Sequence, residues 1–120
     1  MGAKENAVMK SCKDALAVAG VFFWRQNTGG AKMASDRFVR FGVPGAGDYG
    51  GILPGGYYIE VECKTGKGKQ TDNQKQRQVD LERAGACYVL ARGYDDVTEG
   101  ISDFLRRVKY WRGIQALKFR

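Results

Sequence analysis

Three charged residues at alternate positions, Glu60, Glu62 and Lys64, form the group in this sequence best suited to chemistry. Successive side chains of a strand point to opposite faces, so in an extended segment 57–64 these three share one face. Asp48 precedes them, separated by a short apolar segment and a glycine-rich turn signal. A strand–turn–strand arrangement would bring Asp48 and Glu62 close together in space. Taken alone, a Glu-x-Lys pattern is also typical of an exposed strand carrying an ion pair.

Two carboxylates and a backbone carbonyl can hold one Mg²⁺ ion at its required short distances. Such an ion lowers the pKa of a bound water and neutralises charge on a phosphate. Lys64 would orient that water, help to deprotonate it, or stabilise the developing oxyanion. These residues therefore favour a metal-dependent nuclease over a plain basic binding domain.

The sequence contains no histidine and only three cysteines, none of them in a C-x-x-C pair. This composition excludes Ser-His and Cys-His nucleophile systems, histidine-ligated zinc and a histidine general base. Any metal is therefore expected to be held by oxygen, which indicates Mg²⁺ or Mn²⁺. We expect Cys12, Cys63 and Cys87 to be small buried residues of a helix and two strands.

The chain has 20 Lys and Arg against 13 Asp and Glu, a formal charge of +7. This balance favours an anionic partner, although a protein can also be basic without binding one. Residues 104–120 hold six cations and no acid, interleaved with aromatics: Arg106, Arg107, Lys109, Arg112, Lys118 and Arg120, with Phe104, Tyr110, Trp111 and Phe119. Such a segment can contact phosphates and stack on bases, or form an amphipathic helix whose aromatics pack on the core.

The loop at residues 65–70 is rich in glycine and lysine but lacks the spacing of a phosphate-binding P-loop. Lys67 and Lys69 are expected to contact phosphates beside the carboxylates, the alternative being a solvated turn. Further basic residues would extend this surface: Arg25, Lys32, Arg37 and Arg40.

Hydrophobic periodicity and turn residues predict one α/β domain over residues 1–120. Helices are expected at residues 3–19, ended by Gly20, at 71–84, ended by Gly85, and from Asp95 or Thr98 to at least Lys109. The middle helix would begin with Thr71 as N-cap and Gln74 at the capping-box position. Strands are expected at 21–24, 50–53, 57–64 and 86–91, with a turn at Gly29-Gly30, and residues 37–41 could form a further short strand. The predicted order is α-β-β-β-α-β-α, a mixed sheet flanked by helices.

Asp48, Glu62-Cys63-Lys64 and Gln74 resemble the PD-(D/E)XK nuclease superfamily, and more closely a stand-alone VRR-NUC (virus-type replication-repair nuclease) domain. The resemblance covers nearly the whole chain, from Glu5 on the first helix to the strand after Gly85. In one departure, Pro44 lies four residues before Asp48, whereas the family usually has proline directly before its aspartate.

The resemblance implies a restriction-endonuclease-like core and a role for each matched residue. Asp48, Glu62 and the Cys63 carbonyl would be metal ligands, and Lys64 the catalytic lysine. Gln74 would lie beside the site, or serve only the capping box. Glu5 would be a supporting or second-metal acid, or only a first-turn acid favoured by the helix dipole.

Family members that consist of the bare domain tend to come from phages, resemble Holliday-junction resolvases and act as homodimers. A chain of this size has little room for a separate recognition domain, so we expect it to recognise DNA shape and backbone. The expected activity is a Mg²⁺- or Mn²⁺-dependent, structure-selective endonuclease acting on branched DNA, a four-way junction or a flap. Arg25, Arg106, Arg107 and the two loop lysines would contact that DNA.

Two alternatives are a non-catalytic basic nucleic-acid-binding module and a sequence-specific nuclease of the same superfamily. No membrane-spanning run or signal peptide is evident, so we expect no membrane partner and a cytoplasmic location in a bacterial or phage-infected cell.

Overall fold

The computed structural model describes residues 2–26, 29–32 and 38–118, with the backbone alone at 29–32, 38–41 and 118. Its elements in chain order are α1 (Ala3–Val18), β1 (Phe22–Arg25), β2 (Gly29–Lys32), β3 (Phe38–Phe41), β4 (Tyr49–Ile52), β5 (Tyr58–Cys63), α2 (Asp72–Arg83), β6 (Cys87–Ala91) and α3 (Tyr94–Lys118). Four strands form a mixed sheet in the order β1-β4-β5-β6, and only the β5–β6 pair is parallel. The predicted order of helices and strands is confirmed for this sheet and its helices.

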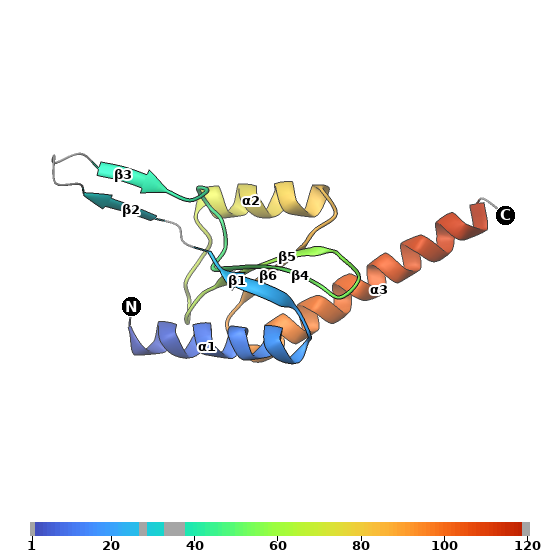
Figure 1. Cartoon of the computed structure of the whole chain (residues 1–120), viewed down its shortest axis with the longest axis horizontal. Helices are drawn as coiled ribbons and strands as arrows, with labels where there is room; N and C mark the ends of the chain where they lie inside the picture. Colours follow the sequence, from blue (N-terminus) through green and yellow to red (C-terminus); the bar gives the residue numbers. More distant parts are fainter. Residues whose placement is uncertain (1, 27–28, 33–37, 119–120) are drawn as a thin grey trace.

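Helices cover both faces of the sheet (Figure 1): α1 and α3 lie on one side and α2 on the other. The alternation of β5 explains this division, because Ile59 and Val61 face the apolar core while Glu60 and Glu62 face α2. Leu16 of α1 and Val97 of α3 are among the buried residues that meet Ile59 and Val61. The three cysteines lie in one helix and two strands as predicted, with Cys12 and Cys87 fully buried and Cys63 partly so.

The helix boundaries follow the predicted stop and start residues closely. Gly20 and Gly85 follow α1 and α2 with φ of 73° and 89°, values in the left-handed region that glycine adopts without strain. Thr71 caps α2, and its side chain and that of Gln74 form the reciprocal hydrogen bonds of a capping box.

Two predictions about the segment between β1 and β4 need correction. Gly29 and Gly30 do not form a turn, because both lie in β2 and pair with Phe41 and Arg40 of β3. The strand predicted at residues 37–41 exists as β3, but it belongs to a separate two-stranded hairpin rather than to the main sheet. This hairpin extends from the end of the molecule where α1 begins (Figure 1). Arg37, predicted to extend the basic surface, lies outside the described residues.

The last helix is longer than the predicted minimum and begins at Tyr94. Its second half projects beyond the sheet (Figure 1), and the molecule measures 64 Å along its longest axis. Phe104 is buried in the core, as the amphipathic-helix interpretation predicts, whereas Tyr110 and Trp111 are exposed. Among the described helices, none is long and apolar enough to cross a bilayer.

Candidate active site

The glycine-rich loop before β4 carries Asp48 into contact with β5 and α2. Gly45 has a φ of 78°, and a side chain there would collide with the Asn73 carbonyl in the first turn of α2. A Cβ on Gly47 would lie 2.8 Å from the Val61 carbonyl oxygen of β5. The glycines are therefore what allows this loop to lie between the sheet and α2. The loop delivers Asp48 to the start of β4 without a proline directly before it.

The Asp48 carboxylate is held from two sides. Its Oδ2 accepts a hydrogen bond of 2.8 Å from the Cys63 amide of β5, and its Oδ1 lies 3.0 Å from Nη1 of Arg25 in β1. Arg25 also donates to the Asp48 carbonyl at 3.2 Å. These contacts fix the position of the carboxylate while part of its surface remains accessible.

Glu62 is 5% exposed and lies between Gln74 and Lys64. Its Oε1 accepts a hydrogen bond of 3.1 Å from Nε2 of Gln74 and lies 3.7 Å from Nζ of Lys64. Burial, followed by repulsion from Asp48, raises the pKa of Glu62 to about 7, against the attraction of Lys64. The Asp48 carboxylate thus lies close enough to Glu62 to contribute to its raised pKa.

Gln74 combines the two roles that its sequence position allowed. Its Oε1 accepts a hydrogen bond of 2.9 Å from the Thr71 amide, which completes the capping box, while its Nε2 reaches Glu62. The start of α2 is therefore tied directly to a proposed catalytic carboxylate.

Glu60 shares the face of Glu62 but has a different environment. Its buried carboxylate receives two hydrogen bonds from Arg77, at 2.9 and 3.0 Å, and one of 2.7 Å from Tyr58. The Gly47 amide and the Gln26 side chain donate as well, each at 3.1 Å. Burial alone would raise the pKa of Glu60, but these donors lower it below the usual value. Both oxygens of Glu60 accept hydrogen bonds from protein donors, and through the Gly47 amide Glu60 stabilises the loop before Asp48.

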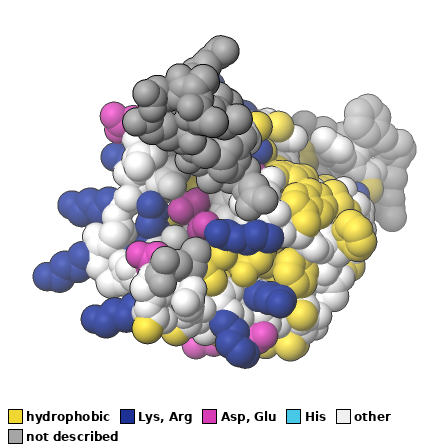
Figure 2. All heavy atoms as spheres, turned by 60° about the vertical axis from the view of Figure 1, so that its left-hand side comes forward, with side chains coloured by type: hydrophobic (Ala, Val, Ile, Leu, Met, Phe, Trp, Pro, Cys, Tyr) yellow, Lys and Arg dark blue, Asp and Glu magenta, His cyan; other side chains and the backbone are white. Residues whose placement is uncertain are grey.

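A cleft of about 250 Å³ opens beside Asp48. Its lining comes from the first turns of α1, the end of β5 and the following loop: Glu5, Val8, Met9, Asp48, Cys63, Lys64, Thr65 and Gly68. Four of the residues predicted for the site, including Glu5 and Lys64, thus meet in one cavity. In Figure 2 acidic side chains lie near the centre of the visible face, with Lys and Arg side chains around them.

The oxygens available for a cation are few but of the right kind. Within the described parts of the chain, no cluster of three or more His, Cys, Asp or Glu side chains could hold a metal ion. Asp48 and Glu62 nevertheless supply two carboxylates whose mutual repulsion a divalent cation would relieve. Hard oxygen donors supplemented by water and phosphate oxygens are what Mg²⁺ uses. These residues therefore fit a Mg²⁺ or Mn²⁺ ion.

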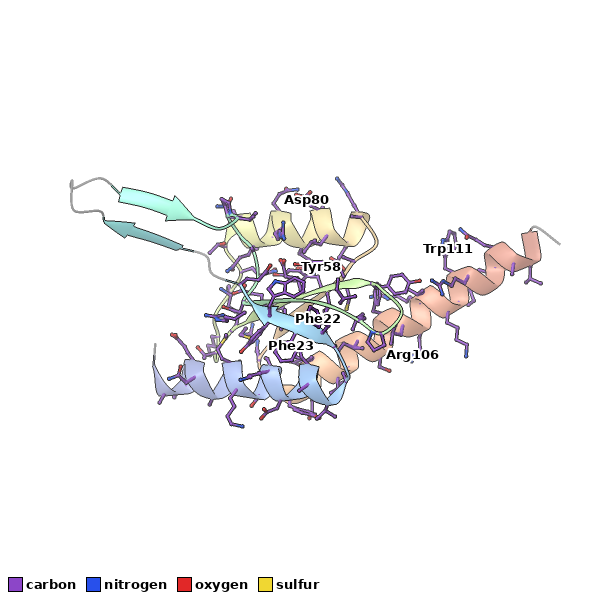
Figure 3. All side chains as sticks on the ribbon, viewed as in Figure 1. Phe22, Phe23, Tyr58, Asp80, Arg106 and Trp111 are labelled. Atoms are coloured by element: carbon purple, nitrogen blue, oxygen red, sulfur yellow. The ribbon has the colours of Figure 1, made fainter. Side chains whose placement is uncertain are left out.

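The predicted DNA-contacting residues fall into two groups. Lys67 and Lys69 are exposed on the loop whose Gly68 lines the cleft. Arg106 lies on α3 (Figure 3), beyond the sheet edge opposite the cleft, where it forms an ion pair with Asp103. Arg107 donates to the Asp103 carbonyl. Arg25 is exposed on β1 and pairs with Asp48, and its contact with DNA stays a prediction.

Three supporting residues were missed from the sequence. Arg77 and Tyr58 donate hydrogen bonds to Glu60. Arg92 donates to the carbonyls of Gly66 and Gly68, at 3.0 and 2.9 Å, and so fixes the loop at residues 65–70, which we call the lysine loop. One signal could have identified Arg77. It follows Gln74 by three residues and so shares its helix face, just as Glu60 shares the strand face of Glu62.

Comparison with known proteins identifies the fold. No protein-family model and no curated protein matches the sequence. A solved structure described as a VRR_NUC domain matches 84% of this chain and 97% of its own, with a TM-score of 0.59 and 24% sequence identity. The chain has the fold of a VRR-NUC domain. The predicted fold class and resemblance are therefore confirmed at the level of structure. In this chain Asp48 and Lys64 line the cleft, and Glu62 lies 3.7 Å from Lys64 and accepts a hydrogen bond from Gln74.

Proposed function

We propose that this protein is a divalent-metal-dependent nuclease that hydrolyses phosphodiester bonds in DNA. One observation carries the proposal: Asp48 and Glu62 lie close enough for their charges to interact, with Lys64 between Glu62 and the cleft. A mutually repelling pair of carboxylates beside a lysine is unfavourable for folding alone and useful for cation and phosphate chemistry. The likeness to a VRR_NUC domain is consistent with this function.

The chain's own residues have separable tasks in this reaction. A Mg²⁺ or Mn²⁺ ion held by Asp48, Glu62 and the Cys63 carbonyl would neutralise phosphate charge and lower the pKa of a water. Lys64 lines the cleft and would orient the attacking water or stabilise the oxyanion. Gln74 fixes Glu62 through its hydrogen bond of 3.1 Å. Arg25 fixes Asp48, so its role is to position the acid.

The preferred substrate is proposed to be branched DNA, a four-way junction or a flap. Lys67 and Lys69 beside the cleft would contact phosphates without reading bases. We further propose that the protein acts as a homodimer on four-way junctions, since two-fold symmetry would present two sites to opposed strands. A bacterial or phage-infected cytoplasm is the proposed location, and Glu5 the proposed supporting acid at the cleft.

The test is cleavage of a four-way junction, a flap and a plain duplex with Mg²⁺, Mn²⁺ or a chelator. Lys64→Ala should reduce the cleavage rate by about 100-fold or more while DNA binding persists, because it removes a group acting on the reacting phosphate. Lys10→Ala is the matched control, since Lys10 is exposed on α1, where it pairs with Asp14 at i+4. Equal cleavage by wild type and Lys64→Ala would refute the assignment. Binding without cleavage under every metal condition would favour the non-catalytic alternative.

A further inference from the structure

Part of the sheet face that carries Glu60 is aromatic and open to solvent. The strand register places Phe22 beside Ile52 and Ile52 beside Tyr58, while Trp24 pairs with Gly50. Direct cross-strand neighbours share a face. Phe22, Trp24 and Ile52 are 76%, 40% and 37% exposed. Figure 3 shows Tyr58 on the α2 side of the sheet and Phe23 on the α1 side, and the register places Phe22 on the face of Tyr58.

These rings form a preorganised surface. A Cβ on Gly50 would lie 2.9 Å from Nε1 of Trp24, so the indole lies directly against the β4 backbone. The ring centroids of Phe22 and Trp24 are 6.2 Å apart, and those of Trp24 and Tyr58 are 6.4 Å apart. Tyr58 is fixed through its hydroxyl, which donates to Glu60 at 2.7 Å. The inner side of this surface is therefore supported while the outer side remains exposed.

The aromatic surface is physically connected to the candidate active site. Gln26 lies two residues after Trp24, and it donates to the Gly47 carbonyl at 3.0 Å and to Glu60 at 3.1 Å, next to Asp48. In Figure 2 apolar side chains gather beside the central acidic side chains, and Lys and Arg side chains lie on both sides of them. A ligand that reaches both regions needs flat apolar rings and negative charge.

We propose that Phe22, Trp24 and Tyr58 stack on unpaired nucleobases of the DNA strand whose phosphate occupies the cleft. The chain's charge of +7 and the exposed Lys67 and Lys69 suit the phosphates of that strand, while the aromatic rings suit its bases. Stacking requires a base outside the helix, so the substrate has a single-stranded arm or splayed bases next to the cut. This inference rests on the proposed function and specifies its substrate.

The two tryptophans of the chain, Trp24 and Trp111, allow a direct test by fluorescence. Trp111→Phe leaves Trp24 as the sole reporter, whereas Trp24→Phe leaves Trp111, which is 58% exposed on the projecting part of α3 (Figure 3). Each variant is titrated with single-stranded oligothymidylate and with a duplex of equal length, in a chelator so that no hydrolysis occurs. Single strands should quench Trp24 strongly and Trp111 weakly, and the duplex should quench Trp24 less.

Affinity provides a second readout. Phe22→Ala and Trp24→Ala should each weaken binding of the single strand by roughly 10-fold, as expected for loss of one stacked base, and leave duplex binding nearly unchanged. Phe22 is mostly exposed, so its truncation leaves the core intact. Tyr110→Ala is the matched control, an exposed aromatic on α3 that should leave single-strand affinity unchanged.

Three outcomes would overturn the proposal. The fluorescence of Trp24 could be unchanged by single strands, or single strands and duplex could quench it equally. Alternatively, it could change with protein concentration without DNA and in step with dimer formation, which would mean that a second copy covers the surface. Binding is measured without metal and is therefore independent of cleavage. If the protein cleaves DNA but Trp24 does not respond to single strands, only this inference is refuted. Stacking by a chain that cleaves nothing refutes only the proposed nuclease activity.

Discussion

Replacing Glu62 by glutamine should remove a pH dependence that burial imposes on the free energy of unfolding. The pKa of Glu62 stands at about 7 against a usual value of 4.5, because burial and then Asp48 disfavour its ionised form. One pKa unit corresponds to about 1.4 kcal/mol, so the ionised carboxylate costs the folded chain at most about 3 kcal/mol. Glutamine keeps an oxygen that can accept the hydrogen bond from Gln74, so the packing is nearly conserved.

The sign and the pH window follow from the two pKa values. Below about pH 4.5 the carboxyl is protonated in both the folded and the unfolded chain, and its ionisation costs nothing. Between pH 4.5 and 7 the unfolded chain releases the proton first, so the wild type loses stability as the pH rises. Glu62→Gln should therefore be more stable than wild type by about 1–3 kcal/mol at alkaline pH, with the difference vanishing in acid.

Urea denaturation followed by circular dichroism, across this pH range in a chelator, measures the difference. Mn²⁺ should then stabilise the wild type more than Glu62→Gln, because the cation relieves the repulsion between Asp48 and Glu62. Glu60→Gln is the control of opposite sign, since the lowered pKa of Glu60 means that its ionised form stabilises the fold. Parallel pH profiles for wild type and Glu62→Gln would refute this account of the site.

Three further perturbations test the supports of the site. Arg77→Met should lower the free energy of unfolding by about 3 kcal/mol or more, because it leaves the buried Glu60 carboxylate without its main partner, and adding Glu60→Gln should recover part of the loss in the same urea assay. Gly47→Ala should destabilise by about 1–3 kcal/mol, since its Cβ would lie 2.8 Å from a β5 carbonyl, whereas Gly113→Ala in open space on α3 should stabilise by up to about 1 kcal/mol. Arg92→Gln should release the lysine loop, seen as faster amide hydrogen exchange at residues 65–70 and weaker DNA binding; unchanged exchange would contradict the role of this arginine.

The site was predictable from sequence wherever a residue's position followed from local periodicity. Glu62 and Lys64 share a face because strands alternate, and Gln74 is fixed by a capping box that needs only residues three apart. The pairing of Asp48 with Cys63 depends instead on the fit of the glycine loop against β5. That fit is a matter of backbone approach, and it shows no periodic pattern.

Sequence patterns missed contacts that join distant parts of the chain. They did not show that Arg25, which we expect to contact DNA, pairs with Asp48, 23 residues away. Gly29-Gly30 carries the composition of a turn, but pairing with β3 holds both residues in an extended ladder. At Gly29-Gly30 strand pairing overrode the local preference for a turn.

The helix α2 illustrates why the candidate site and the fold cannot be considered separately. None of its residues is fully buried, so apolar packing contributes little to its attachment. Its face toward the sheet includes Gln74, Arg77 and Gln78, which contact Glu62, Glu60 and Gln70. Hydrogen bonds and one buried ion pair therefore set the position of α2.

Glu60 and Glu62 provide an internal comparison within this polar layer. They lie on the same face of the same strand, two residues apart, and both are buried. Protein donors fill both oxygens of Glu60 and lower its pKa, whereas Glu62 has one amide donor and a lysine at 3.7 Å, and its pKa rises to about 7. The fold thus satisfies one carboxylate and leaves its neighbour short of positive charge at the end nearer the cleft. A buried carboxylate that the protein does not neutralise is costly unless something else supplies the charge, and a divalent cation beside Asp48 would do so.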